Sequence, residues 1–296
     1  MKKSSTAAKK RKQIKGYLFI APMIILLAVF TIYPMIFSFI ISLTDWNFLS
    51  GLEGMKWNGI QNYLELPQDI WFRDSICNTI EYTLLYVPVT MVISFILACF
   101  LNNKVFGAKT LRLFYFIPYI SSISAVSILW TILYSPSGPI VSFLERFGIT
   151  APNFLADTTW ALPAITLMSV WMNSGYCALI CVAGMQGIPK DVLESAEIDG
   201  ATGITRTLKI ILPLLSKTTF FLLITQMINS FKVFSQIQIM TGGGPVRSTT
   251  VLGYYIYQSA FVDYRFGYAS SMAVILFIVI LIFTLLQTKF QKKFDY

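Results

Sequence analysis

Long apolar runs separated by shorter polar segments dominate this sequence. A helix needs roughly 20 mainly apolar residues to cross a hydrocarbon core, and six windows meet that length. They cover residues 17–43, 79–101, 111–134, 160–184, 210–231 and 268–287. No sustained period-two alternation with turn signals lies between them, which favours helices over a membrane barrel. We therefore predict an all-α integral membrane protein with six transmembrane helices.

The composition agrees with this prediction. Hydrophobic residues make up 55% of the 296 residues and charged residues only 12%, whereas soluble domains carry about 25% charged residues. The formal net charge of +9 is then best explained by membrane topology and by contact with anionic lipid, not by nucleic-acid binding.

The placement of basic residues predicts the topology. Most of the 23 lysines and arginines lie in the N-terminal tail, after the second and fourth windows, and near the C-terminus. Because positive charge stays on the cytoplasmic side, we expect both termini in the cytoplasm. The first apolar run is too long for a signal peptide and has no cleavage signal. We therefore divide the chain into a basic cytoplasmic tail, residues 1–15, and a six-helix membrane domain, residues 16–296.

One cytoplasmic segment between the fourth and fifth windows is polar and carries helix start and stop signals. Pro189 precedes a predicted helix over residues 190–198, and Gly200 follows it; proline favours helix starts and glycine favours helix ends. Val192, Leu193 and Ala196 give the helix an apolar side. Since nine residues form only a marginal helix in water, we expect a partner to pack against it.

At these positions the chain resembles the cytoplasmic "EAA" loop of binding-protein-dependent ATP-binding-cassette (ABC) importers. The matching residues are Glu194, Ser195, Ala196, Asp199, Gly200, Ala201, Ile210, Leu212 and Pro213. Ser195 replaces the middle alanine of the family pattern. In the alternative interpretation, this is a solvated loop whose glycine and prolines only turn the chain.

The resemblance extends over nearly the whole chain. The segments "SLTDWN", "GIQNYLEL", "GMQGIPKDV", "MTGGGP" and "FGYASSMAV" are similar to the sugar-importer branch, whose permeases include those of maltose and glycerol-phosphate systems. The resemblance implies a permease domain with a coupling loop at residues 189–213, in a bacterial or archaeal inner membrane.

The resemblance also implies partners and a mechanism. Such a permease pairs with a second related permease, two cytoplasmic ATPase subunits and an external solute-binding protein, and it works by alternating access. The helix at residues 189–200 would move as a lever in a cleft of the ATPase. ATP and Mg²⁺ would bind the ATPase, so we expect no cofactor and no enzymatic activity in this chain.

Polar side chains at membrane depth are costly and usually face a bundle interior or a wet cavity. Two windows carry such faces at helical spacing. The candidate pathway residues are Ser169, Met172, Asn173, Tyr176, Gln226, Asn229 and Ser230. In related permeases, pathway residues lie at the positions of Gln226 and Asn229. Neutral amides and hydroxyls suit a sugar and favour an oligosaccharide over a phosphorylated solute. Hydrogen bonding between packed helices is the alternative role for each residue.

A cysteine pair and a glycine-rich segment each have two interpretations. Cys177 and Cys181 lie one helical turn apart, but the chain has no histidine, so packing is a better explanation than a metal site. The glycine-rich segment 241–249 lacks the Gly-Lys-Ser/Thr spacing that binds phosphates. Its family counterpart lies at the outer mouth, and a flexible hinge is the competing interpretation.

Two other function classes remain as alternatives. An ion-coupled secondary transporter of a small polar solute would need an acid or base within the membrane, and only Glu81 and Lys217, near helix ends, come close. A membrane enzyme would need reactive groups that converge on a cleft, which a chain without histidine and with few carboxylates outside its loops does not suggest. The family resemblance alone gives the direction of transport.

Overall fold

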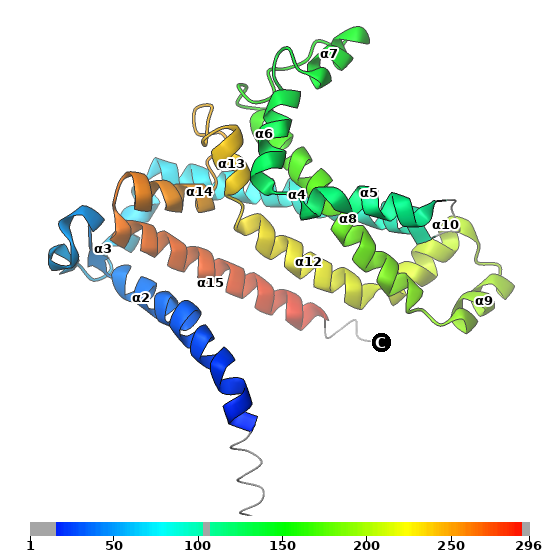
Figure 1. The fold of residues 1–296 in the computed structure, drawn as a ribbon, viewed down its shortest axis with the longest axis horizontal. Helices are drawn as coiled ribbons and strands as arrows, with labels where there is room; N and C mark the ends of the chain where they lie inside the picture. The colour runs from blue at the N-terminus through cyan, green and yellow to red at the C-terminus, as the bar shows by residue number, and fades with distance from the viewer. Residues whose placement is uncertain (1–15, 103–106, 292–296) are drawn as a thin grey trace, which may run out of the picture. The chain divides into compact units, whose positions relative to one another are not determined.

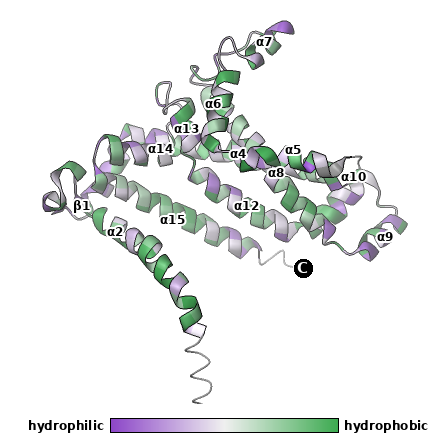
Figure 2. Cartoon of the chain, viewed as in Figure 1, coloured by the Kyte–Doolittle hydropathy of each residue, from purple (hydrophilic) through white to green (hydrophobic). Residues whose placement is uncertain are grey.

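The computed structural model describes residues 16–102 and 107–291, so the predicted basic tail at residues 1–15 lies outside the described residues. Within them, four helices are long and apolar enough to cross a membrane, and two bent helix pairs raise the possible number to six. Figure 2 shows the apolar character of long helices such as α15 (Phe266–Gln291). The predicted all-α membrane fold is confirmed.

The chain forms two compact units. The first comprises Met1–Glu65, of which 16–65 are described, together with Ser259–Val274. Its elements are a span at Gly16–Ile41 that ends in α2 (Tyr33–Ile41), 3-10 turns at Phe48–Ser50 and Leu52–Gly54, strands β1 (Thr44–Asp45) and β2 (Lys56–Trp57), and helix α3 (Gln61–Glu65). The π-helical turn Ala28–Ile32 lies within the first span.

Backbone contacts hold the first unit together after the first span. The two strands pair antiparallel, with Thr44 opposite Trp57. The Asn62 amide donates from Nδ2 to the carbonyl oxygens of Ser42 and Thr44, each at 2.9 Å. A Cβ on Gly267 would lie 2.0 Å from the Thr44 carbonyl oxygen, so only glycine allows the start of α15 to approach this strand so closely.

The second unit comprises Leu66–Gln258 and Ile275–Tyr296. Its helices are α4 (Ile70–Asn102), α5 (Ala108–Ile120), α6 (Ile123–Leu133), α7 (Pro139–Arg146), α8 (Ala161–Gln186), α9 (Lys190–Ile198), α10 (Gly203–Arg206), α11 (Leu212–Leu214), α12 (Ser216–Phe231), α13 (Ser235–Met240) and α14 (Leu252–Tyr257). A 3-10 turn at Leu66–Gln68 precedes them, and π-helical turns lie at Thr207–Ile211 and Gln258–Val262. Helix α8 packs along α4 and against α5, and α12 packs against α4 (Figure 1).

Four of the predicted windows correspond to single long helices, at Gly16–Ile41, Ile70–Asn102, Ala161–Gln186 and Phe266–Gln291. The second of these begins nine residues before the predicted window. Glu81, predicted near a helix start, is therefore an exposed residue inside α4. The apolar count missed this extension because Arg73 and Asp74 interrupt the apolar run in the first turns of α4.

The prediction of one continuous third span was wrong. Helices Thr110–Ile120 and Ile123–Leu133 meet at an angle of 98°. Pro118 lies in the last turn of α5, and Ser121 at its end is extended, with φ −74° and ψ 153°. Because proline removes a backbone donor and Ser121 turns its hydroxyl to the Ile117 carbonyl oxygen at 2.8 Å, the helix ends here.

The prediction of a continuous fifth span was also wrong. Helices Gly203–Leu214 and Ser216–Phe231 meet at 71°. Pro213 lies just before the break, and Leu215 has φ −83° and ψ 5°. Proline cannot donate to the preceding turn, so the chain kinks where hydropathy alone indicates one apolar run.

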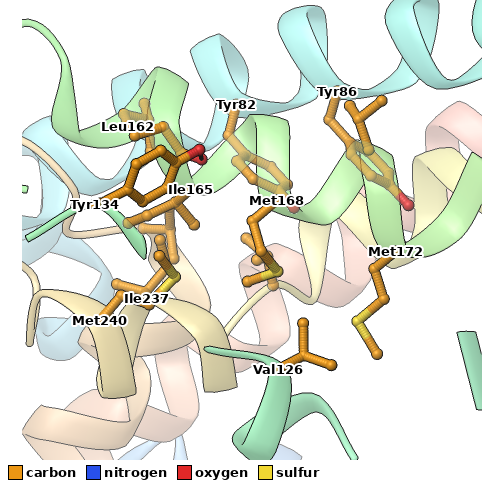
Figure 3. Packing of buried hydrophobic residues seen from close by; sticks show 14 of the residues in the cluster. Tyr82, Tyr86, Val126, Tyr134, Leu162, Ile165, Met168, Met172, Ile237 and Met240 are labelled. Atoms are coloured by element: carbon orange, nitrogen blue, oxygen red, sulfur yellow. Dashed lines mark hydrogen bonds between the residues drawn. The ribbon is translucent and has the colours of Figure 1, made fainter. Parts of the chain in front are cut away.

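Two apolar clusters form the core of the second unit. The first gathers side chains of α4, α8 and α13, including Tyr82, Met168 and Ile237 (Figure 3). The second contains Cys177 and Cys181, both buried in α8. Their burial among apolar side chains agrees with a packing role for the two cysteines.

Helices α5 and α8 cross at a single glycine. A Cβ on Gly175 would lie 1.7 Å from the carbonyl oxygen of Tyr115, which is far inside van der Waals contact. A small residue at this position is therefore required for the two helices to approach each other, as is common where membrane helices cross.

Candidate functional site

The predicted coupling helix forms at the residues expected. Helix α9 covers Lys190–Ile198, as the sequence signals predict. Pro189 is the N-cap residue directly before the helix, with φ −57° and ψ 137°. Figure 1 shows α9 as a separate short helix between the long α8 and the bent pair that begins with α10.

The end of α9 is a Schellman motif. The Gly200 N–H donates to the Glu197 carbonyl oxygen at 3.0 Å, and the Ala201 N–H donates to the Ala196 carbonyl oxygen at 2.8 Å. Gly200 has φ +82°, the left-handed conformation that this motif needs after the C-cap residue Asp199. Asp199, Gly200 and Ala201 therefore fix the reversal through their backbone.

The pattern of buried and exposed side chains on α9 differs from the prediction. Ala196 is buried, as expected for its apolar side, but Val192 is exposed. Two apolar residues that the sequence analysis did not single out are the most exposed ones here, Ile198 at 87% and Ile204 at 77%. Both side chains are accessible for contact with another protein.

The remaining coupling residues lie on two features. Glu194 and Ser195 are exposed on α9, and Ser195 also lines a shallow groove with Asp199 and Ile210. Leu212 and Pro213 begin α11, directly before the 71° bend. The segment thus joins an exposed helix to a bent membrane helix.

Two of the seven pathway candidates are held in hydrogen bonds between packed helices. Buried Gln226 accepts a bond from the Tyr86 hydroxyl at 2.6 Å and donates from Nε2 to Cys177 Sγ at 3.0 Å. Ser230 accepts from Thr83 Oγ1 at 3.0 Å. For these residues the geometry favours the packing alternative.

Ser169 and two further candidates are also enclosed or stacked. Ser169 donates to the Ile165 carbonyl oxygen at 3.0 Å and is buried. Met172 belongs to the first core cluster. Tyr176 stacks on Tyr119, with ring centroids 4.3 Å apart and planes 10° apart.

Asn173 and Asn229 line a common pocket of about 400 Å³, within the usual size range of ligand sites. Residues that the sequence analysis did not select line the same pocket: Tyr82, Lys232, Phe234 and Gln236. Gln236 donates from Nε2 to Ser169 Oγ at 3.3 Å. Gln236 could have been identified from the sequence as a polar residue in the apolar stretch that follows the fifth window. The seven candidates thus separate into two pocket residues and five packed ones.

The glycine-rich segment 241–249 is anchored by side-chain contacts. The Arg247 guanidinium pairs with Asp74 at 2.8 Å and lies over the Trp71 ring at 5.2 Å. Asn78 donates from Nδ2 to the Arg247 and Thr250 carbonyl oxygens at 2.8 and 2.9 Å. These contacts at the C-terminal end of the segment argue against a freely flexible hinge.

Among the described residues, no three His, Cys, Asp or Glu side chains gather closely enough to hold a metal ion. The polar groups of the pocket are instead amides, hydroxyls and one ammonium group. This set can donate and accept hydrogen bonds but offers no nucleophile paired with a base.

Comparison with known proteins gives consistent matches over most of the chain. The family model for "Binding-protein-dependent transport system inner membrane component" matches residues 72–296. The probable ABC transporter permease protein YesP of Bacillus subtilis is 34% identical over 98% of this chain and 93% of its own length. The lactose transport system permease protein LacF of Rhizobium radiobacter is 30% identical, covering 96% of each chain.

A solved structure shares the fold. A chain of a bacterial ABC transporter involved in the import of the acidic polysaccharide alginate superposes with a TM-score of 0.85. It is 23% identical, and the match covers 99% of this chain and all of that one.

Proposed function

This chain belongs to the family of inner membrane components of binding-protein-dependent transport systems, and we propose that its solute is a sugar, specifically an oligosaccharide. The all-α fold, the family and the transport role predicted from the sequence are confirmed. LacF, one of its relatives, is a lactose permease by name. This relationship, combined with the pocket that the amides of Asn173, Asn229 and Gln236 line, supports a sugar as solute.

The observation that carries the proposed mechanism is the exposed helix α9 with its fixed C-terminal reversal. We propose that this helix sits in a cleft of one of the two ATPase subunits, so that closure of the ATPases on ATP moves it. Ile198 and Ile204 offer apolar contact area. In this proposal the fixed turn at Gly200 and the segment up to the bend after Pro213 transmit a displacement of α9 to the helices behind it.

The proposed assembly contains a second related permease and an external solute-binding protein besides the ATPases. ATP and Mg²⁺ would bind the ATPases, and this chain would hold no cofactor of its own. Both termini would lie in the cytoplasm, because the basic residues cluster on that side. The two permeases would enclose the solute path, and Asn173 and Asn229 would contribute to it from this chain.

ATP-dependent uptake tests the transport proposal. The complete complex is reconstituted in vesicles with its binding protein and a radiolabelled oligosaccharide that this protein binds. We expect uptake only with ATP on the ATPase side and no effect of an ionophore. Uptake that continues without ATP but stops when the ion gradient collapses would establish the ion-coupled carrier instead.

Site-directed crosslinking tests the docking of α9. The Ile198 side chain is 87% exposed, so an Ile198→Cys variant should crosslink to the ATPase in the assembled complex. Ala196 is a poor crosslinking position because it is buried. Phe147→Cys is the matched control, since Phe147 is also an exposed apolar residue after a short helix and lies in a predicted external loop. Equal crosslinking of both variants, or none at Ile198, would rule out the proposed contact.

A further inference from the structure

The pocket at the C-terminal end of α12 carries one unbalanced charge. Lys232 follows the last residue of α12 and lines the pocket with Asn173, Asn229 and Gln236. Among the described residues that line it, no other side chain is charged. The pocket is therefore polar, with a single positive charge.

No protein group described in the structure neutralises Lys232. Within residues 16–102 and 107–291, its ammonium group has neither an ion-pair nor a hydrogen-bond partner. The acidic residue nearest in sequence to the lining residues is Glu81, which precedes Tyr82 on α4 but does not line the pocket. Lys232 is exposed and follows the last residue of α12, so its ammonium group faces the open side of the pocket. A single positive charge at the mouth of a pocket raises the local concentration of anions, so this site favours an anionic occupant.

The groups around Lys232 also have free hydrogen-bonding capacity. The Asn229 amide has no side-chain partner in the described part of the chain and lies one turn before Lys232. Asn173 donates from Nδ2 to the Ser169 carbonyl oxygen at 2.9 Å, which leaves its Oδ1 as an acceptor. An ammonium group together with free amide donors and acceptors fits a molecule that has both hydroxyls and a negative group.

The number of charges distinguishes between anionic groups. A phosphate monoester carries about −1.5 to −2 charges near neutral pH, which one lysine would leave partly uncompensated. A carboxylate carries one charge and matches Lys232. Phe234 adds an aromatic face at the same pocket.

We propose that Lys232 selects saccharides that carry a carboxylate, such as those built from uronic acids, over neutral saccharides of the same shape. The inference rests on the proposed sugar transport. It assigns Lys232 as a specificity-determining residue through a charge-assisted hydrogen bond to the carboxylate, with Asn173 and Asn229 bonding to hydroxyls.

The test compares one saccharide with and without its charge. The complete transporter, with its binding protein and ATP, is given a trisaccharide that contains a single uronic acid residue, or the methyl ester of that trisaccharide, which keeps the shape but lacks the carboxylate. We expect faster uptake of the acid by the unaltered transporter. Lys232→Gln should lower uptake of the acid about tenfold and leave uptake of the ester unchanged, while Lys232→Arg should keep the preference.

Controls separate the selective role from other roles of this lysine. Lys289→Gln removes a charge from an exposed position on α15 and should change neither uptake. A lysine at a helix C-terminus also meets the negative end of the helix dipole, and it could pair with a carboxylate of the second permease. Either role predicts equal losses for acid and ester in Lys232→Gln, a result that would overturn the inference.

Two further results are decisive. Uptake of neutral saccharides but not of the acid by the unaltered transporter would overturn the selectivity and leave the proposed function intact. A lack of ATP-dependent uptake for every saccharide offered, in a complex that hydrolyses ATP, would overturn the proposed function and the inference together. A triose phosphate offered in parallel should be taken up more slowly than the acid, and faster uptake would assign the pocket to phosphates.

Discussion

The proposed coupling segment and the proposed solute pocket differ in how their residues are brought together. Helix α9 and its reversal lie within about a dozen consecutive residues, and each feature depends on neighbours in the sequence, such as the bonds from Gly200 and Ala201 back into α9. The pocket draws its residues from α4, α6, α8, the end of α12 and the segment after α12. No local pattern connects Tyr82, Asn173 and Lys232.

This difference explains which residues tolerate change. In the coupling segment, backbone conformation is essential and most side chains point outward, so single side-chain changes should have small effects except at Gly200. In the pocket, adjacent polar residues have unlike roles, because Gln226 is packed and bonded whereas Asn229 is open to the pocket. Three predictions test this contrast, in decreasing order of expected effect.

Gly200→Val should abolish most uptake while ATP hydrolysis and membrane insertion persist. A side chain at φ +82° costs about 1–2 kcal/mol, a factor of about 5–30 in the population of the reversal, and a β-branched residue fits worse. Uptake and ATPase rates of the same reconstituted complex give the measurement.

Two variants control for strain alone. Gly200→Asn should restore much of the uptake, because asparagine tolerates the left-handed conformation. Gly148→Val introduces the same strain at φ +73°, also without a close contact, but after α7, and should leave coupling intact. Normal uptake by Gly200→Val would remove the lever from the mechanism.

Gln226→Leu and Asn229→Leu should separate stability from transport. Gln226→Leu leaves the Tyr86 hydroxyl without its acceptor and should lower the stability of the folded permease by about 0.6–2 kcal/mol. Asn229→Leu should keep the unfolding midpoint and reduce uptake several-fold, about the effect of one lost hydrogen bond. Thermal unfolding in detergent and vesicle uptake report the two quantities. A lower midpoint for Asn229→Leu with unaltered uptake would place that residue in the packed class.

Glu197→Gln should have the smallest effect. Glu197 and Arg206 lie 3.9 Å apart in the coupling segment and are largely exposed, and such pairs contribute about 0–1 kcal/mol. We expect uptake within about twofold of the unaltered protein. Asp74→Asn, which breaks the closer 2.8 Å pair with Arg247, should destabilise the segment at 241–249 more. A large loss of uptake in Glu197→Gln alone would show that charge on α9 contributes to docking.

Local chemistry made the coupling segment predictable. Proline and glycine restrict or extend the backbone angles of single residues, so the ends of α9 follow from Pro189 and Gly200 without knowledge of the fold. The long apolar windows were predictable for a related reason, because the thickness of the membrane sets the helix length. The two bends were not predicted, because a proline within an apolar run hardly changes the mean hydropathy of that run.

The sequence by itself determined the membrane class, the long helices, the coupling helix and its reversal, since each depends on contiguous residues. Only the tertiary structure decided which polar side chains are bonded between helices and which line the pocket. Helical spacing predicts which residues lie on the same face of a helix. It does not predict which other helix packs against that face, because that helix is far away in the sequence. For that reason Ser169 and Asn173, on one predicted face of α8, have different surroundings, and Lys232, outside every predicted span, joins Asn229 at the pocket.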